Sequence, residues 1–355
     1  MNIKLEPFKF IRILKWESNE KIGSHGELII EGVVSAPSFS EVAKHLKSSV
    51  KEPIVISSVV NENDEEIVTF CGRITAINQS PFADNEFKVA VKIKTSSYLL
   101  DIVSKTRSFQ TYGLTYRNVV ESCLETDEFN LIVNEQEYEE EISNLLLQYK
   151  ETNWNFTKRI ASKFNLPVIA NSETEDRNIY IGLPKAKKDI PKIETENYKV
   201  SITPMHTGNS RTYFELTHSN IYRLGECVSF DGEVLRVVEV KRFLQNNEVL
   251  NTYVLSETVS EEMIQTDHIN LCNTFVLGEV VDINRGLIKM KINGDENADN
   301  SEEFIESRWL SYGLAPFRSS KELTWYMMPE IGDEVRLVFE SSTSSSFENT
   351  YCINK

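Results

Sequence analysis

The chain has 355 residues, enough for two or three domains with their own cores. It is 40% hydrophobic and 26% charged, a soluble globular composition that argues against wholesale disorder. Acidic residues outnumber basic ones by 54 to 38, a formal net charge of -16. Because phosphate binding needs a basic surface, this charge argues against a protein that coats DNA or anionic lipid.

Residues 1–100 predict an antiparallel, barrel-like domain. Phe8–Trp16 alternates apolar and polar side chains, and Gly26–Val34 and three later stretches also read as strands. The alternation is clearest in EFKVAVKIK, whose apolar positions are Phe87, Val89, Val91 and Ile93. Between the strands, SFSEVAKHL predicts a short helix, with Ser38 or Ser40 as its N-cap.

Residues 101–193 predict an α/β insert. Leu114–Leu124 reads as a helix with Thr115 as its N-cap. Residues 125–141 hold eight acidic and no basic residues, the pattern of a solvated loop or helix face.

The insert also holds QYKETNWNFTKRIASKFNLP, the most distinctive stretch of the chain. ISNLLLQY predicts a strand, and Thr152 predicts the N-cap of a helix that ends near Phe164. Phe156, Ile160 and Phe164 form one apolar stripe, with Trp154 near the helix start. With LPVIA as the next strand, we expect a strand–helix–strand unit. Its aromatic residues are better explained as core than as a cofactor-stacking platform.

Residues 194–271 predict a second antiparallel barrel, and residues 272–355 a barrel of about five strands, the number in an OB fold. Asp231-Gly232 and Asn246–Val249 mark hairpin turns in the former, and Asn284–Gly286 marks one in the latter. LPKAKKDIPK, ahead of the second barrel, is the best linker candidate.

No pattern predicts a catalytic, cofactor-binding or metal site. The five histidines are isolated, and no GxSxG, P-loop or GxGxxG sequence occurs. The five cysteines are far apart and odd in number, which predicts reduced, buried thiols: Cys71, Cys123, Cys227, Cys272 and Cys352. The N-terminus lacks the apolar core of a signal peptide, and no run approaches the roughly 18 apolar residues of a membrane span.

Several stretches, spread over essentially the whole chain, resemble the central hub proteins of contractile injection machines. This family includes VgrG-type spikes, the late control protein D of contractile phages and phage baseplate hubs. LLLQYKETNWNFTKRIASKFNLPV is similar to its most recognisable segment, with matches at Gln148, Tyr149, Glu151, Thr152, Phe156 and Arg159. The segments FCGRITAI and SFQTYGLTYRNVVESCL also resemble the family, and Phe109 and Gln110 match in the latter. PEIGDEVRLVFE is similar to its OB domain, with matches at Pro329, Gly332, Asp333, Glu334 and Val335.

The resemblance implies a mainly β fold with an α/β insert, made of two antiparallel β-barrel hub domains and a C-terminal OB-fold barrel. It implies a homotrimer whose six similar barrels adapt a threefold spike to a sixfold tail tube. The implied partners are the hexameric tail tube protein, a needle or spike-tip protein and other baseplate proteins. We expect no nucleic-acid binding beyond passage through the tube, no membrane insertion and no cofactor. We expect assembly in the cytoplasm and then incorporation into the tail or particle.

On these grounds seven residues are expected to stabilise the structure: Trp154, Phe156, Ile160, Phe164, Trp325, Pro329 and Gly332. Two other functions stay open. One is a tail-associated cell-wall hydrolase, because 54 acidic residues do not exclude a catalytic pair. The other is nucleic-acid binding by the OB-type barrel, which carries Trp309, Tyr312, Trp325 and Tyr326 between acidic loops. Relatives usually continue into a β-helical needle, whereas this sequence stops at Lys355, so the needle is a separate chain or the sequence ends short of it. The sequence does not identify the machine.

Overall fold

A computed structural model describes residues 2–48, 54–60, 66–133, 136–142, 145–204, 210–246, 248–259, 275–297, 309–312, 328–339 and 350–354. The fold is mainly β with an α/β insert, as predicted. The chain divides into two compact units. The first comprises residues 1–99, 127–135 and 165–265, and the second comprises residues 100–126, 136–164 and 266–355. The predicted division at residues 100, 193 and 271 stays a prediction, since both units take parts of the insert.

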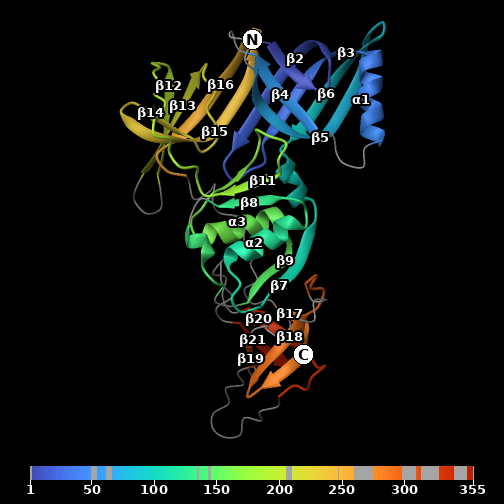
Figure 1. Ribbon diagram of the computed structural model, residues 1–355, viewed down its shortest axis with the longest axis vertical. Helices are drawn as coiled ribbons and strands as arrows, with labels where there is room; N and C mark the ends of the chain where they lie inside the picture. Colours follow the sequence, from blue (N-terminus) through green and yellow to red (C-terminus); the bar gives the residue numbers. More distant parts are fainter. Residues whose placement is uncertain are drawn as a thin grey trace. The chain divides into compact units, whose positions relative to one another are not determined.

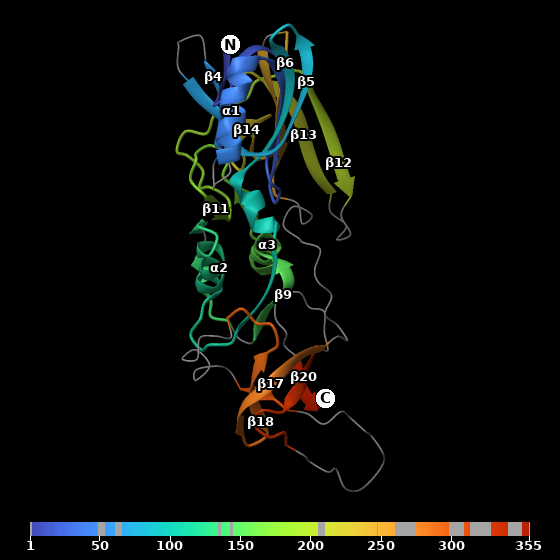
Figure 2. The same ribbon diagram turned by 90° about the vertical axis from the view of Figure 1, so that its right-hand side faces the viewer.

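Most of the first unit is one eleven-stranded antiparallel sheet, in which ten strands follow the order β1-β4-β5-β6-β3-β2-β15-β16-β13-β12 and β14 pairs with β15 (Figure 1). Its strands are β1 Asn2–Glu6, β2 Phe10–Lys21, β3 Glu27–Ser35, β4 Ile54–Val60, β5 Glu66–Ala83, β6 Glu86–Lys94, β12 Tyr198–Pro204, β13 Ser210–His218, β14 Cys227–Phe230, β15 Glu233–Gln245 and β16 Glu248–Ser256. The hairpin of β12 and β13 ends the sheet (Figure 2).

Apart from β1, which pairs with β4, the sheet consists of two modules with the same topology. The first module is β2 to β6, in the order β4-β5-β6-β3-β2, and the second is β12 to β16, in the order β14-β15-β16-β13-β12. Strand by strand, β2 corresponds to β12, β4 to β14 and β5 to β15. Each module has its own core: Trp16, Phe70 and Val91 lie in one, and Phe230, Val237 and Tyr253 in the other. The modules join where β2 pairs with β15.

Sequence periodicity accounts for these strands. Val89, Val91 and Ile93 of β6 are fully buried, while Lys88 and Lys92 on the opposite face are paired with Glu31 and Glu27 of β3. The predicted Asp231-Gly232 turn connects β14 and β15, with φ of 51° and 81°. Both residues are in the left-handed region, as a two-residue hairpin of this type requires.

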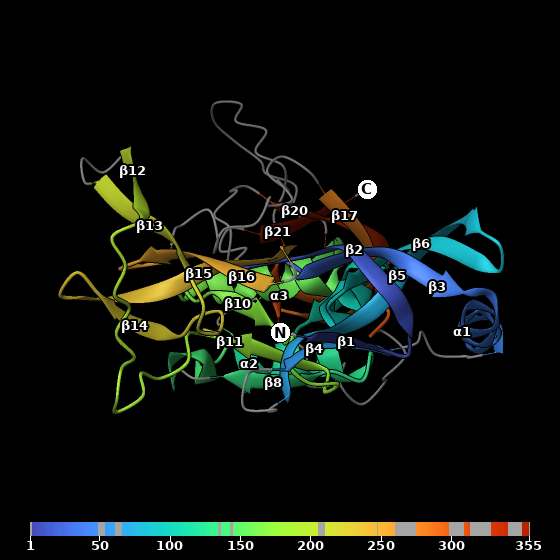
Figure 3. The same cartoon turned by 90° about the horizontal axis from the view of Figure 1, so that it is seen from above.

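The helix of the first module, α1 (Ala36–Ser48), starts earlier than predicted. The hydroxyl of Ser35 accepts the backbone N–H of Ser38 at 3.4 Å, so Ser35 takes the capping role. Ser38 and Ser40 lie inside the helix, and their assignment as caps was wrong. In Figure 3, α1 lies next to β3, far from β12 and β13.

The first unit also contains a three-stranded sheet in the order β10-β11-β8. Its strands are β8 Asn130–Val133, β10 Val168–Ala170 and β11 Asn178–Ile181. β8 lies within the acidic run that was predicted to be a loop or helix face. The short apolar stretch NLIV inside that run forms a strand that pairs with β11. The acidic residues on both sides of it obscured the strand pattern in the sequence.

The 3₁₀ helix η1 (Ser96–Asp101) spans the boundary between the units, since the first unit ends at Leu99 and the second begins at Leu100. The pattern of EFKVAVKIKTSSYLL predicted a strand over these residues instead. Helix α2 (Tyr116–Glu125) has Thr115 as its N-cap, and α3 (Asn153–Lys163) has Thr152, both as predicted. A second short helix, η2, spans Gln136–Glu139. In a two-stranded sheet, β7 (Ser104–Phe109) pairs with β9 (Leu146–Thr152). The predicted strand, helix and strand are present as β9, α3 and β10, but β9 pairs with β7 and β10 pairs with β11, so the two strands belong to different sheets.

Five further strands form an antiparallel sheet in the order β19-β18-β17-β20-β21, the number predicted for the OB-type barrel. They are β17 Phe275–Asn284, β18 Leu287–Ile292, β19 Leu310–Ser311, β20 Glu334–Phe339 and β21 Thr350–Asn354. Leu145 and Leu147 pack into its core. Asp295, 8% exposed, accepts hydrogen bonds from the backbone N–H and hydroxyl of Ser108 in β7. These contacts attach the insert strands to the C-terminal sheet.

Candidate functional site

The distinctive sequence segment forms a hydrogen-bonded corner between β9 and α3. The Gln148 side chain is fully buried, and its Nε2 donates to the carbonyl oxygen of Glu151 at 2.8 Å and to Oδ1 of Asn153 at 3.0 Å. Thr152 accepts the backbone N–H of Asn155 at 3.2 Å, which satisfies one of the free donors at the start of α3. These contacts set the direction in which the helix leaves the strand.

A buried ion pair closes the same corner. Arg159 donates to both carboxylate oxygens of Glu151, with its Nη2 2.9 Å from Oε2, and to the carbonyl oxygen of Leu147 at 2.7 Å. The two side chains are only 8% and 4% exposed. A guanidinium with several fixed acceptors is partly compensated for its loss of hydration. The segment is therefore explained by the folding of this corner, in which the charges of Glu151 and Arg159 neutralise each other.

The aromatic residues of the segment lie in the core of the second unit. Trp154, Phe156 and Ile160 are 3%, 0% and 2% exposed. The Phe156 ring stacks on Phe109 with centroids 5.9 Å apart, and Phe164 is half-buried.

Two of the remaining residues expected to be structural, Pro329 and Gly332, lie just before β20. Pro329 is buried, whereas Gly332 is exposed. Gly332 has a φ of 94°, which favours glycine, and its N–H donates to the carbonyl oxygen of Val280 at 2.8 Å. Its place is a turn before β20 and not the core. Trp325 lies outside the described residues.

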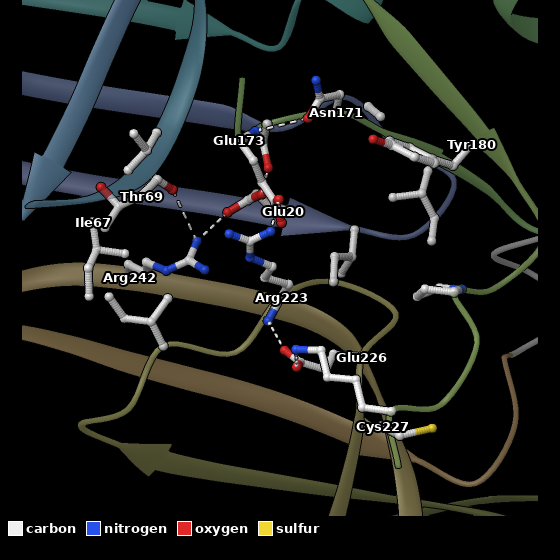
Figure 4. A pocket seen from close by; sticks show the side chains of 18 of the residues that line it. Glu20, Ile67, Thr69, Asn171, Glu173, Tyr180, Arg223, Glu226, Cys227 and Arg242 are labelled. Atoms are coloured by element: carbon white, nitrogen blue, oxygen red, sulfur yellow. Dashed lines mark hydrogen bonds and ion pairs between the residues drawn. The ribbon is translucent and has the colours of Figure 1, made fainter. Parts of the chain in front are cut away.

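A second buried ion pair, which the sequence did not predict, lies where the two modules meet (Figure 4). Nη1 of Arg242, on β15, donates to Oε1 of Glu20, on β2, and their side chains are 5% and 7% exposed. The same guanidinium donates to the carbonyl oxygens of Thr69 at 3.4 Å and Tyr222 at 3.1 Å. One arginine of the second module is thus bonded to two strands of the first.

A loop of the insert supports this pair. The Ser172 hydroxyl donates to the other oxygen of Glu20, and the Ser172 carbonyl accepts the backbone N–H of Cys71 at 2.7 Å. Next to it, Glu173 pairs with Arg223. Burial raises the pKa of the Glu173 carboxyl, and the Arg223 guanidinium opposes part of that rise. We name Glu20, Thr69, Ser172, Tyr222 and Arg242 the junction cluster.

The cysteines that the structure describes with their side chains, Cys71, Cys123 and Cys227, are buried and free, as predicted. Cys272 lies outside the described residues. Among those residues no group of acidic, histidine and cysteine side chains could hold a metal ion. The same part of the chain has no helix with the length and apolarity to cross a membrane.

Cys71 and Cys123 are expected to resist alkylation in the folded protein. Burial raises the pKa of both thiols to about 11, so at pH 8 the reactive thiolate is about two orders of magnitude scarcer than in a free cysteine. Peptide mapping after iodoacetamide treatment should show both residues unmodified, and both modified after denaturation in urea. Rapid native labelling of either would contradict their burial.

Comparison with solved structures gives matches along the whole chain. An E. coli component of the type VI secretion system, described as similar to the T4 bacteriophage tail proteins gp27 and gp5, has a TM-score of 0.64 at 12% identity and covers 99% of both chains. A chain of the lidded Francisella PdpA-VgrG complex has a TM-score of 0.65 at 9% identity, covering 99% of this chain and 70% of that one. A 43 kDa prophage tail protein from Shewanella oneidensis has a TM-score of 0.51 at 10% identity, covering 74% of this chain and 99% of that one.

No protein-family model matches the sequence, and no curated protein matches it. At these identities the structural matches establish the fold. The resemblance inferred from the sequence is thus confirmed in the fold: the chain has the architecture of the VgrG-like hub and phage tail proteins of contractile injection machines.

Proposed function

We propose that this protein is a non-enzymatic baseplate hub of a contractile injection machine, acting as a homotrimer between a threefold spike and a sixfold tail tube. The observation that carries the proposal is the repeated strand order of the two modules in one continuous sheet. Three chains with two equivalent modules each provide six similar surfaces, which a ring of six tube subunits can contact.

The junction inside the chain suggests how chains join. The first half of β15 pairs with β14, and its second half, Glu239–Phe243, pairs with β2. The corresponding strand β5 pairs with β4 through its first half, Glu66–Arg73. In its second half, Ala76–Ala83, the only pairing in the described residues is with β6. In the trimer, β12 of one chain would pair with this free edge of the next, just as β2 pairs with β15.

The exposure of β12 supports this arrangement. All seven of its residues are exposed, and the apolar side chains Tyr198, Val200 and Ile202 are 45%, 45% and 64% exposed. On the corresponding strand β2, the inward residues Trp16, Ser18 and Glu20 are at most 5% exposed. Trp16 lies in the core of the first module, and Ser18 and Glu20 lie in the part of β2 that pairs with β15. An uncovered apolar edge strand invites association, and a neighbouring chain would cover it.

Substituting Ile202 with aspartate is expected to weaken the trimer at least tenfold, because a carboxylate on the apolar side of β12 would have to be buried in the interface. Light scattering over a concentration series measures the effect. Ser201→Asp, on the opposite face of the same strand, is the matched control and should change association much less. If both variants assemble like the unmodified chain, β12 is not in the interface.

The hub proposal also predicts that the chain lacks cell-wall hydrolase activity. A zymogram on peptidoglycan should show no cleared band, whereas clear hydrolysis by this chain would favour the alternative of a tail-associated hydrolase. The proposed partners are the tail tube protein, a needle or spike-tip protein and other baseplate proteins. We propose that assembly takes place in the cytoplasm and the hub then becomes part of the tail or particle.

A further inference from the structure

A pocket of about 280 Å³ lies beside the junction cluster, within the first unit (Figure 4). Its wall is formed by residues of β2, β5, β10, β11, β14 and β15 and by three loops. This volume is close to the lower end of the range of about 300–1,000 Å³ for small-molecule sites. The main apolar side chains of the wall are Ile67, Val68, Ile169, Tyr180 and Leu224.

The residues that line the pocket have a net positive charge, whereas the chain as a whole has a net negative charge. Four basic residues, Lys185, Lys187, Arg223 and Arg242, line it together with three acidic ones, Glu20, Glu173 and Glu226. Four minus three leaves one positive charge, in a chain whose net charge is -16. Such a local excess favours a ligand with a single negative charge.

The acidic groups are already neutralised by the protein. Glu20 pairs with Arg242, Glu173 with Arg223, and Glu226 with Lys187, whose Nζ lies 2.5 Å from Oε1. A cationic ligand would have to displace one of these partners. The pocket therefore has no free carboxylate suited to a cation.

Several cationic donors, in contrast, lack an acceptor. Lys185 is exposed and has no hydrogen-bond or ion-pair partner among the described residues. The Arg223 guanidinium, which is 60% exposed, uses Nη1 for Glu173, and an arginine has five N–H donors in all. Nε of the buried Arg242 has no hydrogen-bond partner within the described structure. An unsatisfied buried donor is costly, but the exposed donors of Lys185 and Arg223 are the ones that a ligand in the pocket can contact.

We propose that this pocket binds a carboxylate carried on a branched apolar body, the chemistry of the C-terminal residue of a polypeptide or of a small apolar acid. The carboxylate lies between Lys185 and Arg223, and the apolar body lies against Val68, Ile169 and Leu224. A planar carboxylate matches the paired N–H groups of a guanidinium, and the apolar walls exclude water around the body. This inference does not depend on the hub function.

The test uses the full chain and saturation-transfer NMR, which detects weak binding to large proteins. N-acetyl-leucine is the probe, and N-acetyl-leucine amide, which has the same body without the charge, is the matched ligand. The acid is expected to bind at least tenfold more tightly than the amide. A comparison with 4-methylpentanoate identifies the source: tighter binding of N-acetyl-leucine indicates a polypeptide terminus, and equal binding indicates a small acid.

Two matched pairs of variants locate the site. Lys185→Gln should weaken binding of N-acetyl-leucine about fivefold, as expected for the loss of one charge-assisted contact of roughly 1 kcal/mol. Lys188→Gln, on the same loop but outside the pocket, should leave binding unchanged. At the pocket wall, Val68→Asp should abolish binding of the acid by repulsion, whereas Val68→Asn should retain most of it. No binding of the acid to the unmodified chain, equal binding of acid and amide, or equal effects within either variant pair would overturn the proposal.

Discussion

Replacing Phe156 with alanine is expected to lower the free energy of unfolding by about 3–5 kcal/mol, the usual range for truncating a buried aromatic residue. The side chain is fully buried and stacked on Phe109, and the Arg159 guanidinium lies 5.0 Å from its ring centroid. Alanine would leave a cavity under the helix and remove the ring on which Arg159 rests. Urea denaturation, followed by tryptophan fluorescence, measures the loss; Trp154 reports from the same helix.

The control for this experiment is Asn155→Ala, one position earlier on α3. Asn155 is exposed and contributes only its backbone N–H to the cap, so the change should stay within about 0.5 kcal/mol. A loss below about 1 kcal/mol for Phe156→Ala would show that the ring is not an effective part of the core.

Substituting Arg242 with methionine is expected to cost about 3–5 kcal/mol, because it leaves the buried carboxylate of Glu20 without its counter-charge. The carbonyl oxygens of Thr69 and Tyr222 would lose their donor as well. The variant should also loosen the pairing of β2 with β15. Hydrogen exchange at Lys21 and Glu239, opposite each other in that pairing, would detect the loosening.

A double variant separates the charge from the packing. Arg242→Met combined with Glu20→Leu removes both charges, and we expect it to recover much of the stability lost in the single variant. Lys92→Met, which breaks an exposed pair with Glu27 at 4.0 Å, should produce no measurable change. If Arg242→Met is as harmless as Lys92→Met, the junction cluster does not hold the modules together.

The features that could be predicted from the sequence are those encoded over a few residues. Thr115 and Thr152 were recognisable as N-caps because each precedes an apolar pattern of helical period. The alternation in β6 and the Asp231-Gly232 turn also follow from local chemistry. In contrast, β8 was missed because its charged neighbours outweighed its three apolar residues, and the N-cap of α1 was placed too late because three serines compete there.

The junction cluster could not be predicted, since Glu20 and Arg242 are 222 positions apart in the sequence. A weak signal existed. Arg242 follows the buried Val240 by two positions, and Glu20 follows the buried Ser18 by two, so both charges fall on inward-facing positions of their strands. A charged residue on the apolar face of a strand needs an oppositely charged partner, but only the fold shows which residue that partner is.

The structure explains the matches to the family in the β9–α3 segment through the folding of the corner. The Gln148 and Arg159 side chains donate to backbone carbonyl groups of the corner, and Thr152 accepts a backbone N–H of α3. Arg159 also forms an ion pair with Glu151. The types of these residues gave no hint of the bonds themselves.

The most direct test of the hub proposal is an averaged electron-microscopy image of the assembled particle at a resolution that shows strands. We predict three copies of the chain, with the Met1–Leu100 and Glu194–Leu271 regions alternating at one radius as six similar modules and β12 of each chain beside β5 of the next. Those two regions placed at unrelated radii, or a copy number other than three, would contradict the account.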